Sequence, residues 1–192
     1  MSQREESEFT LPFPDYPCNV ANVRTRPVIH PSAYIAPSAA LTGAVRVGAE
    51  SSLWHNVMAR GDFNYVEVGN QCNIQDGACL HNTAQAPCII RDRSSVGHMA
   101  IVHGSLIEEE CLIGMGAIVM NHVVVGRGSI VGAGALVLDG TIIPPGSLVL
   151  GSPAKVRGPL NEEQAKLIPH TWKSYVNYSR AYLKFGVQPY PV

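Results

Sequence analysis

Apolar residues recur at every sixth position along most of this chain. Four places after most of them stands a small or β-branched residue, and glycine frequently lies between the two. The period is interrupted three times: three extra residues follow Ala59, four more lie between Ala84 and Ile90, and Ile107 comes one residue early. The apolar positions are Ile29, Ile35, Leu41, Val47, Leu53, Ala59, Val68, Ile74, Leu80, Ile90, Val96, Val102, Ile107, Ile113, Val119, Val125, Val131, Val137, Ile143 and Val149.

This period predicts a coil of short strands. An α-helix repeats its apolar face about every 3.6 residues and a half-buried strand every two, whereas a period of six suits a short strand followed by a tight turn. Three such units close a triangular coil, in which the first and fifth positions point inward and stack on their counterparts one coil away. We therefore expect an all-β fold, a parallel β-helix shaped as a triangular prism, over residues 27–158. A β-sandwich with coincidental spacing is the alternative.

The flanks of the repeat lack this period. Residues 1–26 are predicted to form an extended segment that lies across the prism or a neighbouring chain. Residues 159–192 are predicted to form a helix and a tail, because an Asn-x-x-Gln capping box at Asn161 and Gln164 opens a helical pattern that runs to Phe185, interrupted near Pro169. One stripe of this helix should pack along a flank of the prism, and it comprises Trp172, Tyr175, Val176, Ser179 and Leu183.

The composition excludes several classes of protein. The chain carries 14 Lys and Arg residues against 15 Asp and Glu residues without a basic cluster, so binding to nucleic acid or anionic lipid is not expected. No apolar stretch approaches the roughly 18 residues of a membrane span, and the first residues lack the basic-then-apolar pattern of a secretion signal. The five cysteines include no Cys-x-x-Cys pair. We therefore expect free thiols in a reducing compartment and a cytoplasmic protein.

Counting the repeat places two histidines in one column. His81 follows the inward Leu80 and His103 follows the inward Val102, and the two are separated by one coil plus the four-residue insertion. Both side chains should therefore point outward from adjacent strands, about 5 Å apart, where they can share a metal ion. By the same count Arg60 joins this column one coil earlier.

His98 falls on the preceding side of the triangle. It lies two places after Val96, in a column with His55 and Asp76, so it is not expected to reach a metal held by the other two histidines of its own chain. A third nitrogen could come from His98 of another chain if three prisms pack about a three-fold axis as a homotrimer. Three imidazoles with an open fourth position describe a catalytic zinc site, in which the pKa of bound water falls to about 7. Alternatively, these are surface histidines that bind nothing.

Three segments resemble the γ-class carbonic anhydrases. They are Arg60-Gly-Asp62, the run Asn73-Ile-Gln-Asp76-Gly before Leu80-His81, and Gly97-His98-Met-Ala-Ile-Val-His103-Gly104. Hexads such as Ile-Gly-x-Gly-Ala-x at residues 113–118 are similar to those of hexapeptide-repeat proteins in general, and this resemblance implies that the β-helix is left-handed.

The resemblance also implies roles for individual residues. His81, His98 and His103 match the metal ligands, for Zn²⁺ or alternatively Fe²⁺ or Co²⁺, and Gln75 matches the residue that orients the metal-bound hydroxide. Tyr175 and Asn177 are similar to the residues that support this glutamine. Arg60, Asp62 and Asp76 match a group of ion pairs at the subunit boundary, although Arg60 with Asp62 could equally form a structural salt bridge.

The sequence departs from the family pattern at two places. Phe63 stands where the best-studied members have a glutamate, and the neutral residues 82–85 replace an acidic loop. The resemblance associates both acidic features with export of the proton, so we expect low activity unless buffer, Glu67, His55 or His122 takes over this role.

The expected function is reversible hydration of carbon dioxide to bicarbonate at metal sites between the subunits of a homotrimer. One alternative is a metal-dependent acyl-CoA thioesterase of the same family, and another is a non-catalytic trimeric scaffold. A hexapeptide acyltransferase is disfavoured, because the stretch from Gly151 to Lys155 is common to the whole fold and no long acceptor loop with a catalytic histidine is present.

Overall fold

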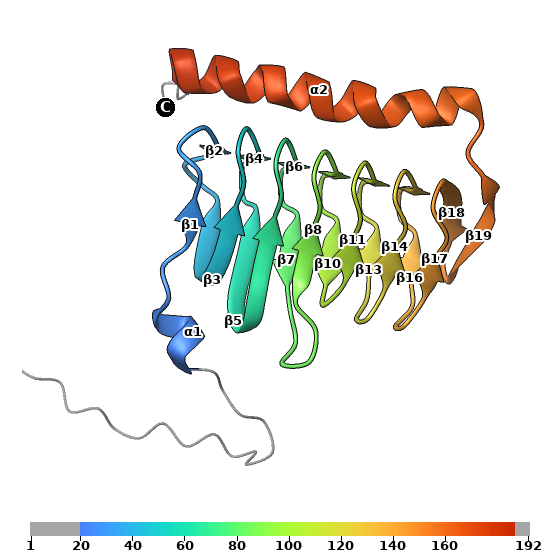
Figure 1. The fold of residues 1–192 in the computed structure, drawn as a ribbon, viewed down its shortest axis with the longest axis horizontal. Coiled ribbons are helices and arrows are strands. Elements are labelled where there is room, and N and C mark those ends of the chain that lie inside the picture. Colours follow the sequence, from blue (N-terminus) through green and yellow to red (C-terminus); the bar gives the residue numbers. More distant parts are fainter. Residues whose placement is uncertain (1–19, 187–192) are drawn as a thin grey trace, which may run out of the picture.

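The computed structural model describes residues 20–186, which form a parallel β-solenoid of about seven turns followed by one long helix (Figure 1). The hexapeptide prediction is therefore confirmed. In chain order the elements are α1 (Val20–Arg24), β1 (Val28–Ile29), β2 (Tyr34–Ile35), β3 (Ala40–Val47), β4 (Ser52–Leu53), β5 (Met58–Val68), β6 (Asn73–Ile74), β7 (Cys79–His81), β8 (Cys88–Ile90), β9 (Ser95–Val96), β10 (Ile101–His103), β11 (Leu106–Ile107), β12 (Leu112–Ile113), β13 (Ile118–Val119), β14 (Val124–Val125), β15 (Ile130–Val131), β16 (Leu136–Val137), β17 (Ile142–Ile143), β18 (Ser147–Gly151), β19 (Ala154–Pro159) and α2 (Glu162–Phe185).

The coils stack as a prism with three faces. One face is a sheet in the order β2-β4-β6-β9-β12-β15-β18, with β19 added antiparallel at its end. The other two faces are joined into one sheet, because β5 pairs with β7 through Ala59 and with β8 through Val68. At the corner between these faces Gly61 and Gly43 of β3 come so close that a Cβ on either would strike the neighbouring backbone. The first insertion of the sequence is thus absorbed by two strands that continue around the corner.

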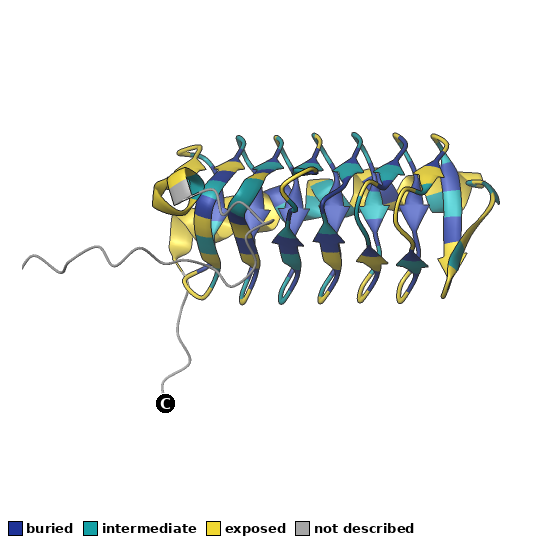
Figure 2. Cartoon of the chain, turned by 90° about the horizontal axis from the view of Figure 1, so that it is seen from below, coloured by how far each residue is buried: buried dark blue, intermediate teal, exposed yellow. Residues whose placement is uncertain are grey.

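Inward side chains form one continuous core along the prism. The aliphatic first positions stack in register, as in the pairing of Val102 with Leu80, and both are fully buried. The fifth positions, such as Cys72 and Cys111, are equally buried. Figure 2 shows buried and exposed positions alternating along the strands of successive coils. The predicted pattern of inward first and fifth positions is confirmed.

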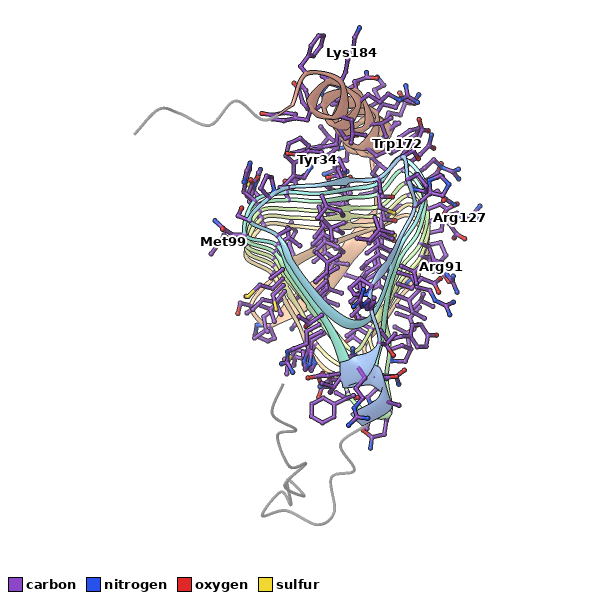
Figure 3. The ribbon with its side chains drawn as sticks, turned by 90° about the vertical axis from the view of Figure 1, so that its left-hand side faces the viewer. Tyr34, Arg91, Met99, Arg127, Trp172 and Lys184 are labelled. Carbon is purple, nitrogen blue, oxygen red and sulfur yellow. The ribbon has the colours of Figure 1, made fainter. Side chains whose placement is uncertain are left out.

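The C-terminal helix α2 lies along the face built from β2, β4, β6 and β9. Its capping box is present: Asn161 Oδ1 accepts from the Gln164 N–H at 2.8 Å, and the Asn161 N–H donates to Gln164 Oε1 at 3.0 Å. Viewed along the prism, Tyr34 and Trp172 lie between α2 and the solenoid (Figure 3). The predicted interruption is wrong, because the helix continues through Pro169. The side chains of Ile168, before this proline, and Val176, after it, are buried and hold α2 against the sheet.

The N-terminal segment contains one departure from the expected extended chain. Val20–Arg24 forms a short helix, α1, that packs against β3 and β5. The remainder of that prediction, residues 1–19, and the tail at residues 187–192 lie outside the described residues. Within residues 20–186 none of the helices has the length and apolar character that crossing a membrane requires.

Candidate metal centre

His81 and His103 end two neighbouring strands of the solenoid. Strands β7 and β10 pair in parallel, with His103 opposite His81, as the counting of the repeat predicted. Nδ1 of His81 lies 2.9 Å from Nε2 of His103, and the ring centroids are 4.9 Å apart. Since Ala59 pairs with Leu80 in the next strand, Arg60 continues the same column. The repeat therefore brings two imidazole nitrogens to one point on the surface.

The other ring nitrogen of His81 contacts a carboxylate. Nε2 of His81 lies 3.0 Å from Oδ1 of Asp62, and the second oxygen of Asp62 accepts from the Arg60 guanidinium. Burial lowers the pKa of His81, which favours the neutral ring. Burial acts to raise the pKa of Asp62, but hydrogen bonds from His81 and Arg60 outweigh it and hold this pKa below its ordinary value. An ionised Asp62 can only accept, so the ring proton of neutral His81 lies on Nε2 and its lone pair on Nδ1.

His103 is held in the same way by a residue that the sequence did not reveal as part of the site. Nδ1 of His103 lies 2.6 Å from Oδ1 of Asn121, which follows β13 one coil later. An amide oxygen accepts, so Nδ1 donates and the lone pair lies on Nε2. The two nitrogens that face each other at 2.9 Å thus both present lone pairs. Such an arrangement repels unless a cation or a proton lies between them.

His98 lies on another edge of the prism, as predicted. Its Nδ1 is 3.1 Å from Oδ2 of Asp76, whose other oxygen accepts from the backbone N–H of His55 at 3.2 Å, so the predicted column of three residues is present. The side chain of His98 is 41% exposed, and its Nε2 lies 3.5 Å from the hydroxyl of Tyr175. Within residues 20–186 of a single chain, His, Cys, Asp and Glu side chains form no cluster of three that could hold a metal.

Gln75 is fixed by a chain of buried polar side chains under α2. Its Nε2 donates to Oδ1 of Asn73 at 2.9 Å, and Nδ2 of Asn73 donates to Oγ of Ser95 at 2.7 Å. All three residues are buried. Asn73 and Ser95 pair across β6 and β9, so their alignment follows from the repeat. Neither Asn73 nor Ser95 was predicted to support Gln75, although polar residues at outward positions beside it are a usable signal of such a role.

The two helix residues expected to support Gln75 are placed differently from each other. Tyr175 packs edge-on against Trp54, at 5.4 Å between centroids, and burial raises the pKa of its hydroxyl. That hydroxyl faces His98, whereas Asn177, two residues further along α2, is exposed. In the described single chain Gln75 bonds to Asn73, so a supporting role for Tyr175 or Asn177 stays a prediction.

A hollow of about 500 Å³ opens beside the histidine pair. Phe63 stands edge-on to His81, with 6.0 Å between the ring centroids, and the neutral residues 82–85 form part of the wall. Both departures from the family pattern therefore line the same hollow as the imidazoles. The hollow is lined by Phe63, His81, Asn82, Thr83, Ala84, Gln85, His103, Asn121, His122 and Asp139.

The chain is similar to known proteins both in its repeat and over most of its length. Residues 104–139 match the family model described as bacterial transferase hexapeptide, six repeats. The chain is 43% identical over 156 residues to a carbonic anhydrase of Geobacillus kaustophilus, covering 81% of this chain and 86% of the relative. It is 37% identical to the mitochondrial gamma carbonic anhydrase 1 of Arabidopsis thaliana, covering 85% of this chain and 62% of that protein.

A solved structure gives the same picture of the fold. A crystal structure of a Bacillus cereus protein, provisionally named an acetyltransferase, superposes with a TM-score of 0.82 at 40% identity. The match covers 84% of this chain and 94% of that protein.

Proposed function

Because the chain belongs to the γ-class carbonic anhydrase family of hexapeptide-repeat proteins, we propose that it hydrates carbon dioxide reversibly at a metal site shared between copies of the chain. The single observation that carries this proposal is the pair of imidazole nitrogens of His81 and His103, 2.9 Å apart, whose lone pairs face each other. Family membership supports carbon dioxide or bicarbonate as the substrate, and the geometry of the two imidazoles supports this position for the metal ion.

The donor set fits a borderline metal ion. Two imidazoles whose outer nitrogens are held by Asp62 and Asn121 present the remaining nitrogens 2.9 Å apart, a few tenths of an ångström less than the separation of about 3.3 Å between two tetrahedral ligands of one zinc ion. Outer hydrogen bonds of this kind orient metal-binding histidines and fix their tautomers. Imidazole nitrogen is a suitable ligand for Zn²⁺, which we propose as the ion, and it also binds Fe²⁺ or Co²⁺. When bound, such an ion acts as a Lewis acid that lowers the pKa of a coordinated water to about 7.

The third ligand in this proposal is His98 of a neighbouring copy. Nδ1 of His98 donates its N–H to the carboxylate of Asp76, which leaves the lone pair on Nε2 at a partly exposed edge of the prism. A heterologous contact of one edge with the histidine face of the next copy closes a ring after three subunits if the rotation between them is 120°. We therefore propose a homotrimer with three shared sites.

An apolar column beside the histidines supports this assembly. In β5, β7, β10, β13 and β16 one outward residue comes directly before the inward aliphatic position. These outward residues pair in register from strand to strand and form a column. Three of them, Met58, Ile101 and Ile118, are exposed in the single chain. Contiguous exposed apolar surface of this kind marks a contact between proteins. The column comprises Met58, Cys79, Ile101, Ile118 and Leu136.

Residues of the chain then perform three tasks. The amide nitrogen of Gln75 donates to Asn73, so in this proposal its Oε1 accepts the O–H of the attacking water and orients the lone pair of that water towards carbon dioxide. Phe63 provides an apolar wall for the uncharged substrate. Hydration releases one proton for each bicarbonate formed, and with neutral residues at 82–85 this proton must pass to His122, Asp139 or buffer, so we expect modest turnover.

Stopped-flow measurement of carbon dioxide hydration, combined with metal analysis of the purified protein, tests the proposal. A strong chelator should abolish hydration, and added Zn²⁺ or Co²⁺ should restore it. Retention of activity in metal-free protein would refute the mechanism.

The alternatives are distinguished by substrate. A panel of acyl-CoA thioesters is the appropriate comparison, because an acetyltransferase activity is suggested for a protein of the same fold. Thioester hydrolysis without carbon dioxide hydration would replace the proposed function with the thioesterase. A trimer that binds zinc and turns over neither class of substrate would be a scaffold.

A further inference from the structure

Asn121 lies between a proposed metal ligand and a carboxylate of the next coil. Its Oδ1 is 2.6 Å from Nδ1 of His103, and its backbone N–H donates to Oδ1 of Asp139 at 2.9 Å. The amide nitrogen Nδ2 of Asn121 also faces this carboxylate oxygen, at 3.5 Å. Asn121 and Asp139 stand two places after Val119 and Val137, which pair across β13 and β16.

These contacts determine the direction of each hydrogen bond. An ionised carboxylate only accepts, so Asp139 draws the Nδ2 side of the Asn121 amide towards itself. The Oδ1 side then faces His103, and because this oxygen also only accepts, Nδ1 of His103 carries the ring proton. A neutral imidazole protonated at Nδ1 has its lone pair on Nε2, the atom that faces His81.

We propose that Asn121 is a positioning residue that, oriented by Asp139, keeps His103 in the tautomer whose Nε2 can bind the metal. This inference rests on the proposed function, since it takes Nε2 of His103 as the metal-binding atom. If the amide turned over, Nδ2 would donate to Nδ1 of His103, and the ring proton would move to Nε2, where it blocks coordination. The orientation of one amide therefore selects between a binding and a non-binding histidine.

A second Asn–Asp pair in the solenoid provides a matched reference. The backbone N–H of Asn70 donates to Oδ1 of Asp92 at 2.8 Å, and Nδ2 of Asn70 lies 3.2 Å from Oδ2 of the same carboxylate. Oδ1 of Asn70 accepts from the backbone N–H of Ala49 at 2.8 Å. The two pairs thus make the same bonds between coils, but Asn70 holds a backbone group where Asn121 holds an imidazole. A purely structural role for Asn121 would make the two asparagines equivalent.

The test compares zinc affinity among variants of the full-length protein. Competition against a chromophoric chelator measures the affinity, and thermal unfolding measures stability in parallel. We expect Asn121→Leu to lower zinc affinity about 10–100-fold. Asn70→Leu should stay within about threefold of wild type in zinc affinity while losing a similar amount of stability, because it removes the same kind of structural bonds. Asn121→Asp should retain the affinity, because a carboxylate oxygen still accepts from Nδ1 of His103.

A second variant covers failure of Asn121→Leu to fold. Asp139→Ala leaves the Asn121 side chain in place but free to turn over, so zinc affinity should fall several-fold, towards the lower end of the range of about 10–100 for outer hydrogen-bond partners. Unchanged affinity in this variant would overturn the role of Asp139.

The outcomes separate the inference from the function on which it rests. Equal zinc affinities for Asn121→Leu and Asn70→Leu overturn the inference, whether both fall or neither does. If wild-type protein binds zinc and shows the Asn121 effect but does not hydrate carbon dioxide, the proposed function fails and the positioning role stands. If wild-type protein binds no zinc, both fail.

Discussion

Arg180 of helix α2 bonds to Glu50 at a corner of the solenoid, across 130 residues of sequence, and its Nε donates to Oε1 at 3.0 Å. Glu50 also accepts from Gln71 of the next coil. Hydrogen bonds from Arg180 and Gln71 lower the pKa of Glu50 in spite of a small opposing effect of burial. The same pair therefore attaches the helix that carries Tyr175 to the coils that carry the candidate site.

This ion pair predicts a small dependence of stability on pH. A carboxyl with a lowered folded-state pKa contributes stability above its unfolded pKa and loses it as the pH falls through the folded value. We expect Glu50→Gln to be less stable than wild type at neutral pH by about 0.2–1 kcal/mol, as for exposed ion pairs, with the difference disappearing as the pH falls through the lowered pKa of Glu50. Thermal unfolding of both proteins from about pH 3 to about pH 8 measures this difference in stability. The control is Glu163→Gln, whose Lys166 partner lies within α2.

The register of the repeat predicts that alanine substitution of two adjacent isoleucines changes stability by very different amounts. Ile143 is 1% exposed and Ile142 is 64% exposed on the same strand, β17. Ile143→Ala should therefore lose about 2–5 kcal/mol of unfolding free energy through the cavity it leaves. Ile142→Ala should change it by about 0.5 kcal/mol or less. Urea unfolding of both variants measures the contrast, and similar losses would contradict the inward and outward assignment.

The buried cysteines should be chemically inert in the folded protein. Burial raises the pKa of both Cys72 and Cys111 to about 12, so almost no thiolate is present at neutral pH. Iodoacetamide should label neither residue in native protein and both in urea, as read by peptide mass spectrometry. Rapid labelling of either thiol without denaturant would show that the core opens locally.

The proposed sharing of the site between chains predicts complementation. His98→Ala and His103→Ala homotrimers should each be inactive, since each removes one ligand from every site. Random mixing of the two chains rebuilds a complete site where a His98→Ala chain supplies His81 and His103 and a His103→Ala chain supplies His98, which is about a quarter of all boundaries. Hydration activity should recover in that proportion after co-refolding. Mixtures as inactive as the parents would place all three ligands in one chain.

The role of Gln75 predicts a loss of turnover without a loss of metal. Gln75→Leu removes the hydrogen-bond acceptor for the attacking water, so kcat/KM should fall by about 10²-fold, the loss usual when a reacting group is no longer held in position. Zinc content should match wild type. As the control, Gln71→Leu alters an amide that bonds to Glu50 instead and should leave kcat/KM unchanged. A fall in zinc content alongside activity would instead make Gln75 a structural residue.

Most of the fold could be predicted from the sequence, because the repeat is local. Each coil places the same kinds of side chain inward, so counting alone aligned His103 with His81 and put His98 in the column of Asp76. The prediction from a local preference failed where a distant contact outweighed that preference. Pro169 removes a helical hydrogen-bond donor, yet α2 continues, since Ile168 and Val176 are buried against the solenoid.

The period of six, by itself, determined the architecture of this protein and the columns in which its histidines stand, because an inward position in one coil must stack on an inward position in the next. Only the tertiary structure decided which atoms of those side chains meet. The lone pairs of His81 and His103 face each other because the N–H on the opposite side of each ring donates to Asp62 or to Asn121. A ring's tautomer depends on the acceptor that happens to lie within 3 Å of it, and this is set by rotamers and by contacts between coils that no spacing along the chain encodes.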